Sequence, residues 1–310
     1  MAESAPLSLP AITAQAAQAA AAGQPWPAGA LYVVATPIGN RADLTLRALY
    51  ALGLVDALAC EDTRVSGALL THLGLAKPLI ALHEHNERDA ATQVIARLAR
   101  GERVAYVSDA GTPAVSDPGA VLVAAVRAAG HPCVPIPGAS SVVTALSVAG
   151  DALAEGFAFV GFAPAKATER RSWLDALAQR GRDSIVLFET PHRIAALLEA
   201  LAVAMPARPV TIARELTKQF DTVHTLAAGE APAWLAADAN RARGEFVLVL
   251  HAQRIDSAAD VLDPSAERTL TLLLAELPLK QAVALAASIT GTPRNALYPR
   301  ALALRGDPSD

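Results

Sequence analysis

The chain is poor in cysteine and in long hydrophobic runs. Its two cysteines, Cys60 and Cys133, are too few for a disulfide framework, and their apolar surroundings favour a reducing compartment. No apolar run approaches the roughly 18 residues that a membrane-spanning helix needs. The start of the chain carries Glu3 and lacks the basic residues of a secretory signal. We therefore expect a globular protein of the cytoplasm.

Several common ligand motifs are also missing. The first predicted strand is not followed by G-x-G-x-x-G, and the chain contains neither G-x-x-x-x-G-K-[ST] nor G-x-S-x-G. These absences argue against a nucleotide-binding protein that holds its ligand by the phosphates. They also argue against a serine hydrolase with a nucleophile elbow. A net charge of -4 shows no general preference for nucleic acid, so any RNA contact would require local basic patches.

Strand and helix patterns alternate from Leu31 onwards, which predicts parallel-rich sheets covered by helices. The later strand patterns lie close together in the sequence, so we expect the second sheet to be mixed. After a linker over 254–263, residues 265–304 have helical patterns that meet at a Gly-Thr-Pro turn, as in a helix-turn-helix unit. The predicted fold class is α/β, with these parts: a flexible tail 1–30, an α/β domain 31–152, a second α/β domain 153–252 and a helical extension 253–310.

The most informative stretch is VAYVSDAGTPAVSDPG, residues 104–119. A short strand pattern ends at Ser108-Asp109, where open α/β sheets place their ligands. Gly111 permits close approach of the backbone to a bound group. We expect Asp117 to cap a helix that starts at Pro118, a more ordinary role than ligand contact.

Polar or glycine-bearing loops follow every predicted strand of the first domain. Because the carboxyl ends of parallel strands share one edge of a sheet, these loops predict a ligand crevice there. Similar loops follow strands of the second domain, so a cleft between the two edges could enclose a mid-sized ligand. His83 and His85 could ligate a metal with Glu84 or Glu87, but polar loop contacts are the more ordinary explanation, and we expect no metal.

The ordered motifs carry a family resemblance. The chain resembles the bacterial 16S rRNA (cytidine-2′-O)-methyltransferases of the tetrapyrrole methylase superfamily. The match runs over about residues 31–251 and rests on these motifs: TPIGN (36–40), EDTR (61–64), HEHNE (83–87), SDAGTP (108–113), PGASS (137–141), ETPHR (189–193), RELTK (214–218) and GEFVLVL (244–250).

The resemblance implies a class III methyltransferase fold, a homodimer, and S-adenosyl-L-methionine bound between the two domains. It also implies 2′-O-methylation of a cytidine in 16S rRNA, on free RNA or on the small ribosomal subunit. Position by position, the cofactor-binding residues that it implies are Pro37, Gly39, Asp109, Ala110, Gly111, Ser140, Ser141, Glu189, Gly244 and Glu245.

A ribose hydroxyl is a weak nucleophile, so a base beside it should help. Four side chains in the motif loops are candidates: Asp62, His85, Glu87 and Glu189. The chain has only four lysines, at positions 77, 166, 218 and 280, and their scatter argues against a scheme built on paired lysines.

RNA binding requires positive charge near the cleft mouth. The candidate side chains could alternatively be part of solvated helix faces. They are Arg64, Lys166, Arg170, Arg171, Arg193, Lys218, Lys280, Arg294 and Arg300.

Two other functions remain open. A tetrapyrrole C-methyltransferase could use the same scaffold, although TPIGN replaces that group's glycine-rich turn. A ribosome-assembly factor that binds rRNA without catalysis is the alternative from another class.

Overall fold

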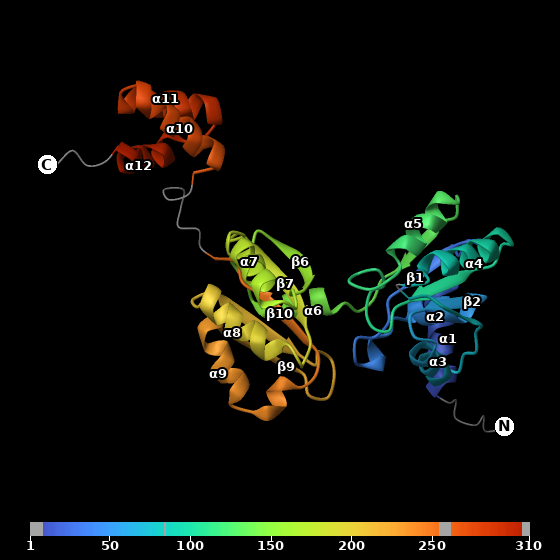
Figure 1. Ribbon diagram of the computed structural model, residues 1–310. Coiled ribbons are helices and arrows are strands. Elements are labelled where there is room, and N and C mark those ends of the chain that lie inside the picture. Colours follow the sequence, from blue (N-terminus) through green and yellow to red (C-terminus); the bar gives the residue numbers. More distant parts are fainter. Residues whose placement is uncertain (1–8, 84, 254–261, 306–310) are drawn as a thin grey trace, which may run out of the picture.

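The computed structural model describes residues 9–83, 85–253 and 262–305. Figure 1 shows these residues as two units that each contain a sheet, followed by a separate group of three helices. Among the described residues no helix is both long and apolar enough to cross a membrane.

The first sheet is wholly parallel, as the alternating pattern predicts. Its strands are β1 (Leu31–Val34), β2 (Ala57–Cys60), β3 (Leu79–Ala81), β4 (Val104–Val107) and β5 (Cys133–Ile136). They lie in the order β3-β2-β4-β1-β5. Helices α2 (Leu46–Leu54) and α3 (Thr63–His72) pack on one face, and α4 (Glu87–Ala99) and α5 (Ala120–Ala128) pack on the other. Both faces are therefore covered, and the central strands are fully apolar.

The N-terminal region is more ordered than the predicted flexible tail. Helix α1 (Leu9–Ala21) lies against α2, with Ala17 and Ala21 buried. Trp26 then donates its indole N–H to the Ala21 carbonyl, 2.9 Å away. The prediction for 1–30 was wrong over residues 9–30. It rested on low-complexity composition, whereas alanine is a strong helix former and its small side chain lets the helix pack closely.

The second sheet is mixed, as predicted. It consists of β6 (Gly156–Phe162), β7 (Asp183–Glu189), β8 (Pro209–Arg214), β9 (Thr222–Ala227) and β10 (Phe246–Leu250). The order is β6-β7-β10-β8-β9, and only the β6–β7 pair is parallel. One face is covered by α7 (Ala167–Ala178), α8 (Ile194–Ala204) and α9 (Ala231–Ala236).

The opposite face of this sheet is covered by α6 (Ser141–Ala149), as Figure 1 shows beside β10. Val142, Ala145 and Ala149 of α6 are buried against Val186 and Val247 of the sheet. The predicted first domain, 31–152, therefore ends too late, because α6 follows the first sheet in sequence but packs on the second. The crossing lies immediately after β5, so the loop at Ala139-Ser140 joins the two units.

The C-terminal group consists of α10 (Pro264–Glu276), α11 (Leu279–Thr290) and α12 (Arg294–Arg305), which confirms the predicted helices. Leu270, Val283, Ala286 and Leu297 form its own buried core. Helix α11 ends at Gly291, which takes a left-handed conformation with φ of 74°. Most of the predicted linker, residues 254–261, lies outside the described residues.

Candidate active site

A cleft of about 330 Å³ lies where the first unit, α6 and the second sheet meet. Its walls combine apolar side chains with a small number of polar and acidic groups, the composition expected of a small-molecule site. The lining residues are Ile38, 110–112, 115–117, 140–142, Phe162, 188–191, Leu216 and 245–247.

The second unit supplies most of the apolar part of the cleft. Phe162 and Phe188 line it, and their rings meet edge to face with centroids 5.7 Å apart. Ile38 and Leu216 approach from loops of the two units and belong to one buried cluster. These walls suit a flat, partly apolar group such as a purine.

The central loop 108–119 is held in an unusual backbone conformation. Ala114 and Ser116 have φ angles of 64° and 66°, in the left-handed region that side chains other than glycine rarely adopt. Thr36 and Gly111 exchange two backbone hydrogen bonds, and the Thr112 hydroxyl donates to the Ala139 carbonyl at 3.1 Å. Such backbone strain is typical of functional loops, and here it faces the cleft.

Asp117 lines the cleft and does not cap a helix. Helix α5 begins after Gly119, whose φ is 119°, so the predicted N-cap at Asp117 was wrong. A Cβ on Gly119 would lie 2.2 Å from the Tyr106 ring, which is why glycine occupies this position. Burial and the nearby Asp109 raise the pKa of Asp117.

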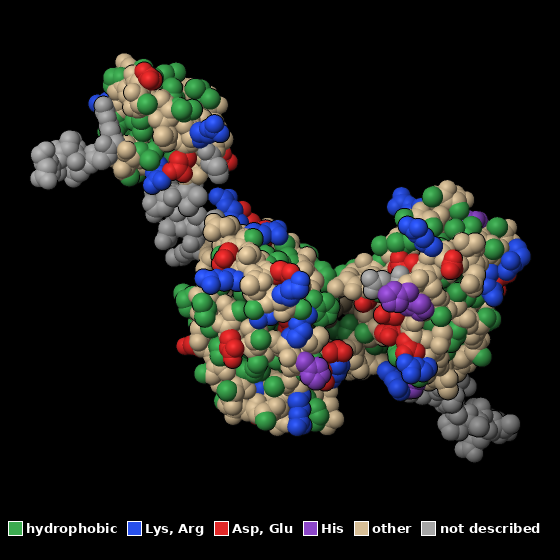
Figure 2. Space-filling view, viewed as in Figure 1, with side chains coloured by type: hydrophobic (Ala, Val, Ile, Leu, Met, Phe, Trp, Pro, Cys, Tyr) green, Lys and Arg blue, Asp and Glu red, His purple; other side chains and the backbone are tan. Residues whose placement is uncertain are grey.

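Acidic groups gather on the first unit beside this loop. Figure 2 shows acidic side chains and histidines together where the first unit faces the second. Burial, followed by the charges of Asp109 and Asp117, also raises the pKa of Glu61. This side of the cleft therefore favours a cationic ligand.

Glu189 provides a fixed carboxylate on the opposite side. Its side chain is 1% exposed, and Oε1 accepts the Thr190 backbone N–H at 2.8 Å. Arg193 Nε lies 3.3 Å from the same oxygen, and the Arg193 guanidinium also donates to the Ala163 carbonyl. Arg193 therefore lies behind the cleft wall and holds Glu189 in place.

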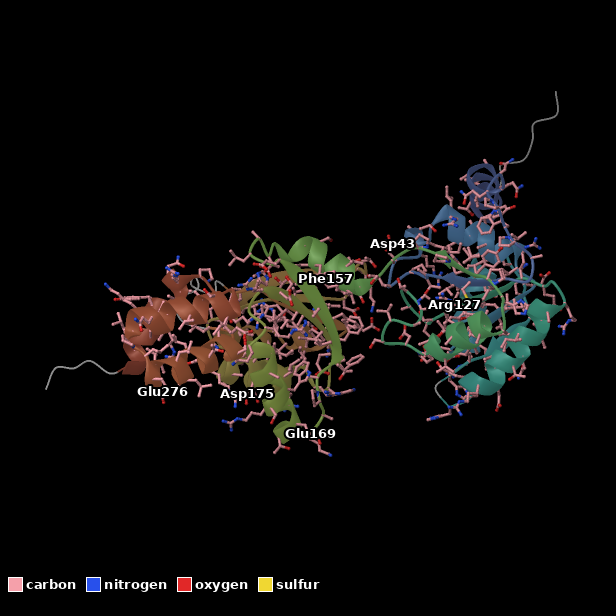
Figure 3. All side chains as sticks on the ribbon, turned by 90° about the horizontal axis from the view of Figure 1, so that it is seen from above. Asp43, Arg127, Phe157, Glu169, Asp175 and Glu276 are labelled. Atoms are coloured by element: carbon pink, nitrogen blue, oxygen red, sulfur yellow. The ribbon has the colours of Figure 1, made fainter. Side chains whose placement is uncertain are left out.

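The loop after β1 docks onto the loop after β8. The Asn40 backbone N–H donates to Thr217 Oγ1 at 3.2 Å, and Figure 3 shows the nearby Asp43 on the side of the first unit towards the second. A Cβ on Gly39 would lie 3.0 Å from the Leu216 carbonyl oxygen. Gly39 is therefore required for close contact between the units.

Lys218 binds two carboxylates at this junction. Its Nζ lies 2.8 Å from Glu215 Oε1 and 3.2 Å from Glu245 Oε2. Burial acts to raise the pKa of Glu215, but Lys218 and the Glu245 backbone N–H outweigh it and lower that pKa. Gly244, with φ of 89°, leaves room for the Glu215 side chain.

The structure brings most of the predicted cofactor residues together. Ala110, Gly111, Ser140, Ser141, Glu189 and Glu245 line the cleft. Pro37, Gly39, Asp109 and Gly244 do not line it but belong to the loops that form it. Phe162, Phe188 and Leu216 were not predicted as site residues, because the two phenylalanines belong to apolar strand patterns and Leu216 is a single apolar residue in a loop.

Three of the candidate bases lie outside the cleft. Asp62 caps α3 and pairs with Arg64, whose hydrogen bonds lower the Asp62 pKa to about 2. His85 and Glu87 line a second surface hollow together with Val121. The strand order explains this separation, because β4 lies between β1 and the strands β2 and β3 that carry these loops.

The two histidines of the HEHNE motif make an edge contact, with ring centroids 6.1 Å apart. Glu84 lies outside the described residues. Within the described ranges, no three His, Cys, Asp or Glu side chains are grouped so that they could hold a metal ion.

The predicted RNA-binding cations fall into two groups. Arg170, Arg193, Lys218 and Arg300 make structural contacts, to carbonyl groups or to Glu189, Glu215, Glu245 and Glu267. Arg64 and Lys166 are 89% and 77% exposed, although each has an acidic neighbour. Arg171, Lys280 and Arg294 are also exposed.

Residues 30–232, more than half of the chain, match the family model described as Tetrapyrrole (Corrin/Porphyrin) Methylases. The chain belongs to this methylase family. Residues 260–305 match a second model, described as the RsmI C-terminal HTH domain, which covers α10–α12.

Within the methylase family the chain is similar to proteins named ribosomal RNA small subunit methyltransferase I. The relative from Neisseria meningitidis serogroup A is 50% identical over 274 residues, 88% of this chain and 93% of that protein. The relative from Escherichia coli O157:H7 is 48% identical, over 90% and 96% of the two chains. Both relatives are named as rRNA methyltransferases. The match to this chain covers nearly their full length.

Solved structures of other methylases share the fold. Uroporphyrin-III C-methyltransferase from Thermus thermophilus, solved with S-adenyl homocysteine, gives a TM-score of 0.51 at 17% identity. The alignment covers 71% of this chain and 96% of that chain. At this identity the likeness establishes the fold of the two sheet-bearing units.

Proposed function

We propose that the protein transfers a methyl group from S-adenosyl-L-methionine to the 2′-oxygen of a cytidine in 16S rRNA. The observation that carries this proposal is the cleft between the two units, with fixed acidic groups and an apolar wall. It occurs in a chain that shares about half of its residues with named small-subunit rRNA methyltransferases.

The cleft residues fit this cofactor. The Glu189 carboxylate lines the cleft from the second unit and favours a sulfonium cation. Ser140 precedes α6, and its hydroxyl does not cap the helix, so the first amides of α6 are available to a carboxylate. Phe162 and Phe188 would hold the adenine against the apolar wall.

The cofactor supplies an activated methyl group on a positively charged sulfur. The contribution of the protein is then alignment of the acceptor oxygen, which can lower a barrier by ~7–11 kcal/mol. Loops from two units must meet to form the cleft, so the contacts of Gly39 and Asn40 with Leu216 and Thr217 also contribute to alignment.

RNA contact belongs to the exposed cations and to the C-terminal helices. Lys166 and Arg171 lie at the start of α7, and Lys280 and Arg294 lie on α11 and α12. The match to a family described as an HTH domain supports a nucleic-acid role for α10–α12. The proposal includes a homodimer acting in the cytoplasm, on small subunits or free 16S rRNA.

A methylation assay tests the proposal. Small subunits from cells that lack the gene are incubated with the purified protein and S-adenosyl-L-methionine labelled in the methyl group. We expect label in 16S rRNA, at one cytidine that becomes resistant to alkaline cleavage on its 3′ side. Free 16S rRNA is tested in parallel, and no label in either substrate would refute the proposal.

The same preparation separates the two alternatives. A tetrapyrrole methylase would label a uroporphyrinogen acceptor and leave rRNA unlabelled. A non-catalytic assembly factor would bind rRNA but give no heat when titrated with S-adenosyl-L-methionine. The fold likeness to a uroporphyrin-III methyltransferase does not favour the first alternative, because the sequence identity is only 17%.

A further inference from the structure

We propose that Asp117 is the general base that takes the proton from the ribose hydroxyl. Glu87 is assigned as a positioning residue that holds the loop of Asp117. This inference rests on the proposed function and names the group within the same cleft that would carry out its proton transfer.

The other acidic groups near the cleft either have charged or backbone partners or, like Glu61, do not line it. Glu189 accepts the Thr190 N–H and lies beside Arg193. Asp109 accepts the Asp62 backbone N–H at 3.0 Å and does not line the cleft. Glu245 pairs with Lys218, and its side chain is 78% exposed. Asp117 lines the cleft and is half-buried; its side chain interacts with the Ser108 hydroxyl but has no ion pair among the described residues.

The backbone on both sides of Asp117 is fixed. Before it, Ser116 has a left-handed φ of 66°. After it, the Tyr106 hydroxyl donates to the Pro118 carbonyl, and the Gly119 N–H donates to Glu87 Oε1 at 2.5 Å. If Asp117 capped a helix, its side chain would accept the Gly119 N–H. The Glu87 carboxylate accepts that N–H instead, and Asp117 lines the cleft.

The surroundings of Asp117 favour uptake of a proton. Burial is the main reason that its pKa is raised, Asp109 adds to the effect, and the Ser108 hydroxyl opposes it. The other titratable groups around it are Glu61, Glu87 and Tyr106. Burial and then the charges of Asp117, Glu61 and Glu87 raise the pKa of Tyr106, and burial with the charges of Asp109 and Asp117 raises the pKa of Glu61. Protonation of Asp117 would remove one negative charge from this group. A base works best when its pKa lies near the working pH, so the shift is in the useful direction.

The proton and electron balance of the step is simple. The O–H bond of the ribose breaks, and its proton moves to a carboxylate oxygen of Asp117. The hydroxyl oxygen forms a bond to the methyl carbon, and the methyl–sulfur bond breaks with its electron pair left on sulfur. Asp117 returns its proton to water after the products leave.

The test uses the full-length protein with Asp117→Asn, which keeps the size of the side chain but cannot take up the proton. We expect kcat on small subunits to fall about 100-fold or more. The Kd for S-adenosyl-L-methionine, measured by calorimetry, should change less than about threefold. Asp89→Asn, an exposed change on α4 near the second hollow, is the matched control and should retain wild-type kcat.

Two further measurements separate a base from a structural residue. In the wild type, kcat should fall as the pH drops through the raised pKa of Asp117, and this acidic limb should be absent from the residual activity of Asp117→Asn. A carboxyl with a raised folded pKa makes the native state relatively less stable above that pKa. Asp117→Asn should therefore unfold at an equal or higher urea concentration than wild type at pH 7.

Glu87 has its own test. Glu87→Ala should lower kcat, because the Gly119 N–H loses its acceptor, while the acidic limb of the pH profile persists. Glu87→Gln keeps an acceptor oxygen and should restore most of the activity. Equal losses in the Ala and Gln variants would overturn the positioning role.

The outcomes distinguish this inference from the proposed function. If the wild type labels no rRNA, the proposed function fails and the inference fails with it. If the wild type is active but Asp117→Asn keeps kcat within tenfold, only the inference is overturned. A rise of tenfold or more in the Kd for S-adenosyl-L-methionine with kcat preserved at saturation would make Asp117 a cofactor contact, which also overturns it.

Discussion

Single residues determine how closely the two units meet at the cleft. Gly39 is the clearest case, because an added Cβ would lie 2.4 Å from Lys218 Cγ and 3.0 Å from both the Leu216 oxygen and Thr217 Oγ1. The lysine chain can move, but the Leu216 carbonyl belongs to the backbone. We expect Gly39→Ala to weaken S-adenosyl-L-methionine binding about tenfold, a loss of about 1.4 kcal/mol, in calorimetry.

Gly53 offers the matched control. It lies in α2, is exposed, and an added Cβ would meet nothing within 4 Å. Gly53→Ala should leave cofactor binding unchanged and should raise the free energy of unfolding by about 0.5–1 kcal/mol, because alanine favours the helix. Wild-type cofactor affinity in Gly39→Ala would show that the contact between the loops is not needed for binding.

The Glu189–Arg193 pair is a second feature at this scale. The Glu189 carboxylate is buried, so removal of its cation leaves an uncompensated charge. Arg193→Leu should lower the free energy of unfolding by about 3 kcal/mol in urea titrations at pH 7. The double variant Glu189→Gln/Arg193→Leu should be more stable than the sum of the single changes predicts, by about 1 kcal/mol. Additive losses would mean that the two side chains act independently.

At the scale of whole elements, α1 shows what an alanine-rich helix can do. Ala17 is 1% exposed against α2, whereas the neighbouring Ala16 faces solvent. Ala17→Asp should lower the free energy of unfolding by more than about 2 kcal/mol, since it buries an unpaired carboxylate. Ala16→Asp adds the same group on the exposed side and should change it by less than about 0.5 kcal/mol. Equal urea midpoints for both variants would mean that α1 does not pack as described.

The sequence patterns predicted the strands of both sheets and most of the helices between them, though not α9, because periodicity reports burial directly. They did not predict that α6 packs on the second sheet, since its apolar face fits either one. The position of Asp117 was missed for a similar reason. Asp-Pro before an apolar run is typical of a helix start, and only the Tyr106 ring against Gly119 shows why the helix begins later.

The sequence predicted which loops lie at the ligand-binding edge of the first sheet, because each follows a strand. It did not predict which of these loops reach the cleft, because that depends on the order of the strands. Loops after β1, β4 and β5 reach the cleft, whereas those after β2 and β3 carry Asp62, His85 and Glu87 away from it. A single sequence shows that all five loops share one edge. It does not show which strands are neighbours, because pairing depends on contacts distant in the chain.

For the molecule as a whole, the separate core of α10–α12 implies that these helices do not take part in cofactor binding. None of the residues that line the cleft comes from these helices, and Leu270, Val283 and Leu297 pack only within the group. A chain that ends at residue 253 should therefore bind S-adenosyl-L-methionine with wild-type affinity. It should bind 16S rRNA more weakly, because it lacks the exposed cations Arg268, Lys280 and Arg294.

The salt dependence of RNA binding makes this last prediction quantitative. Each phosphate contact contributes ~0.7–0.9 to the slope of log affinity against log salt concentration. Loss of three exposed cations should reduce the slope by about two in a filter-binding titration. The triple variant Arg268→Gln/Lys280→Gln/Arg294→Gln, in the full chain, should show the same reduction if the charges, and not the helices alone, contact the phosphates. An unchanged slope in both proteins would place the RNA contact on the two sheet-bearing units, at Arg64, Lys166 and Arg171.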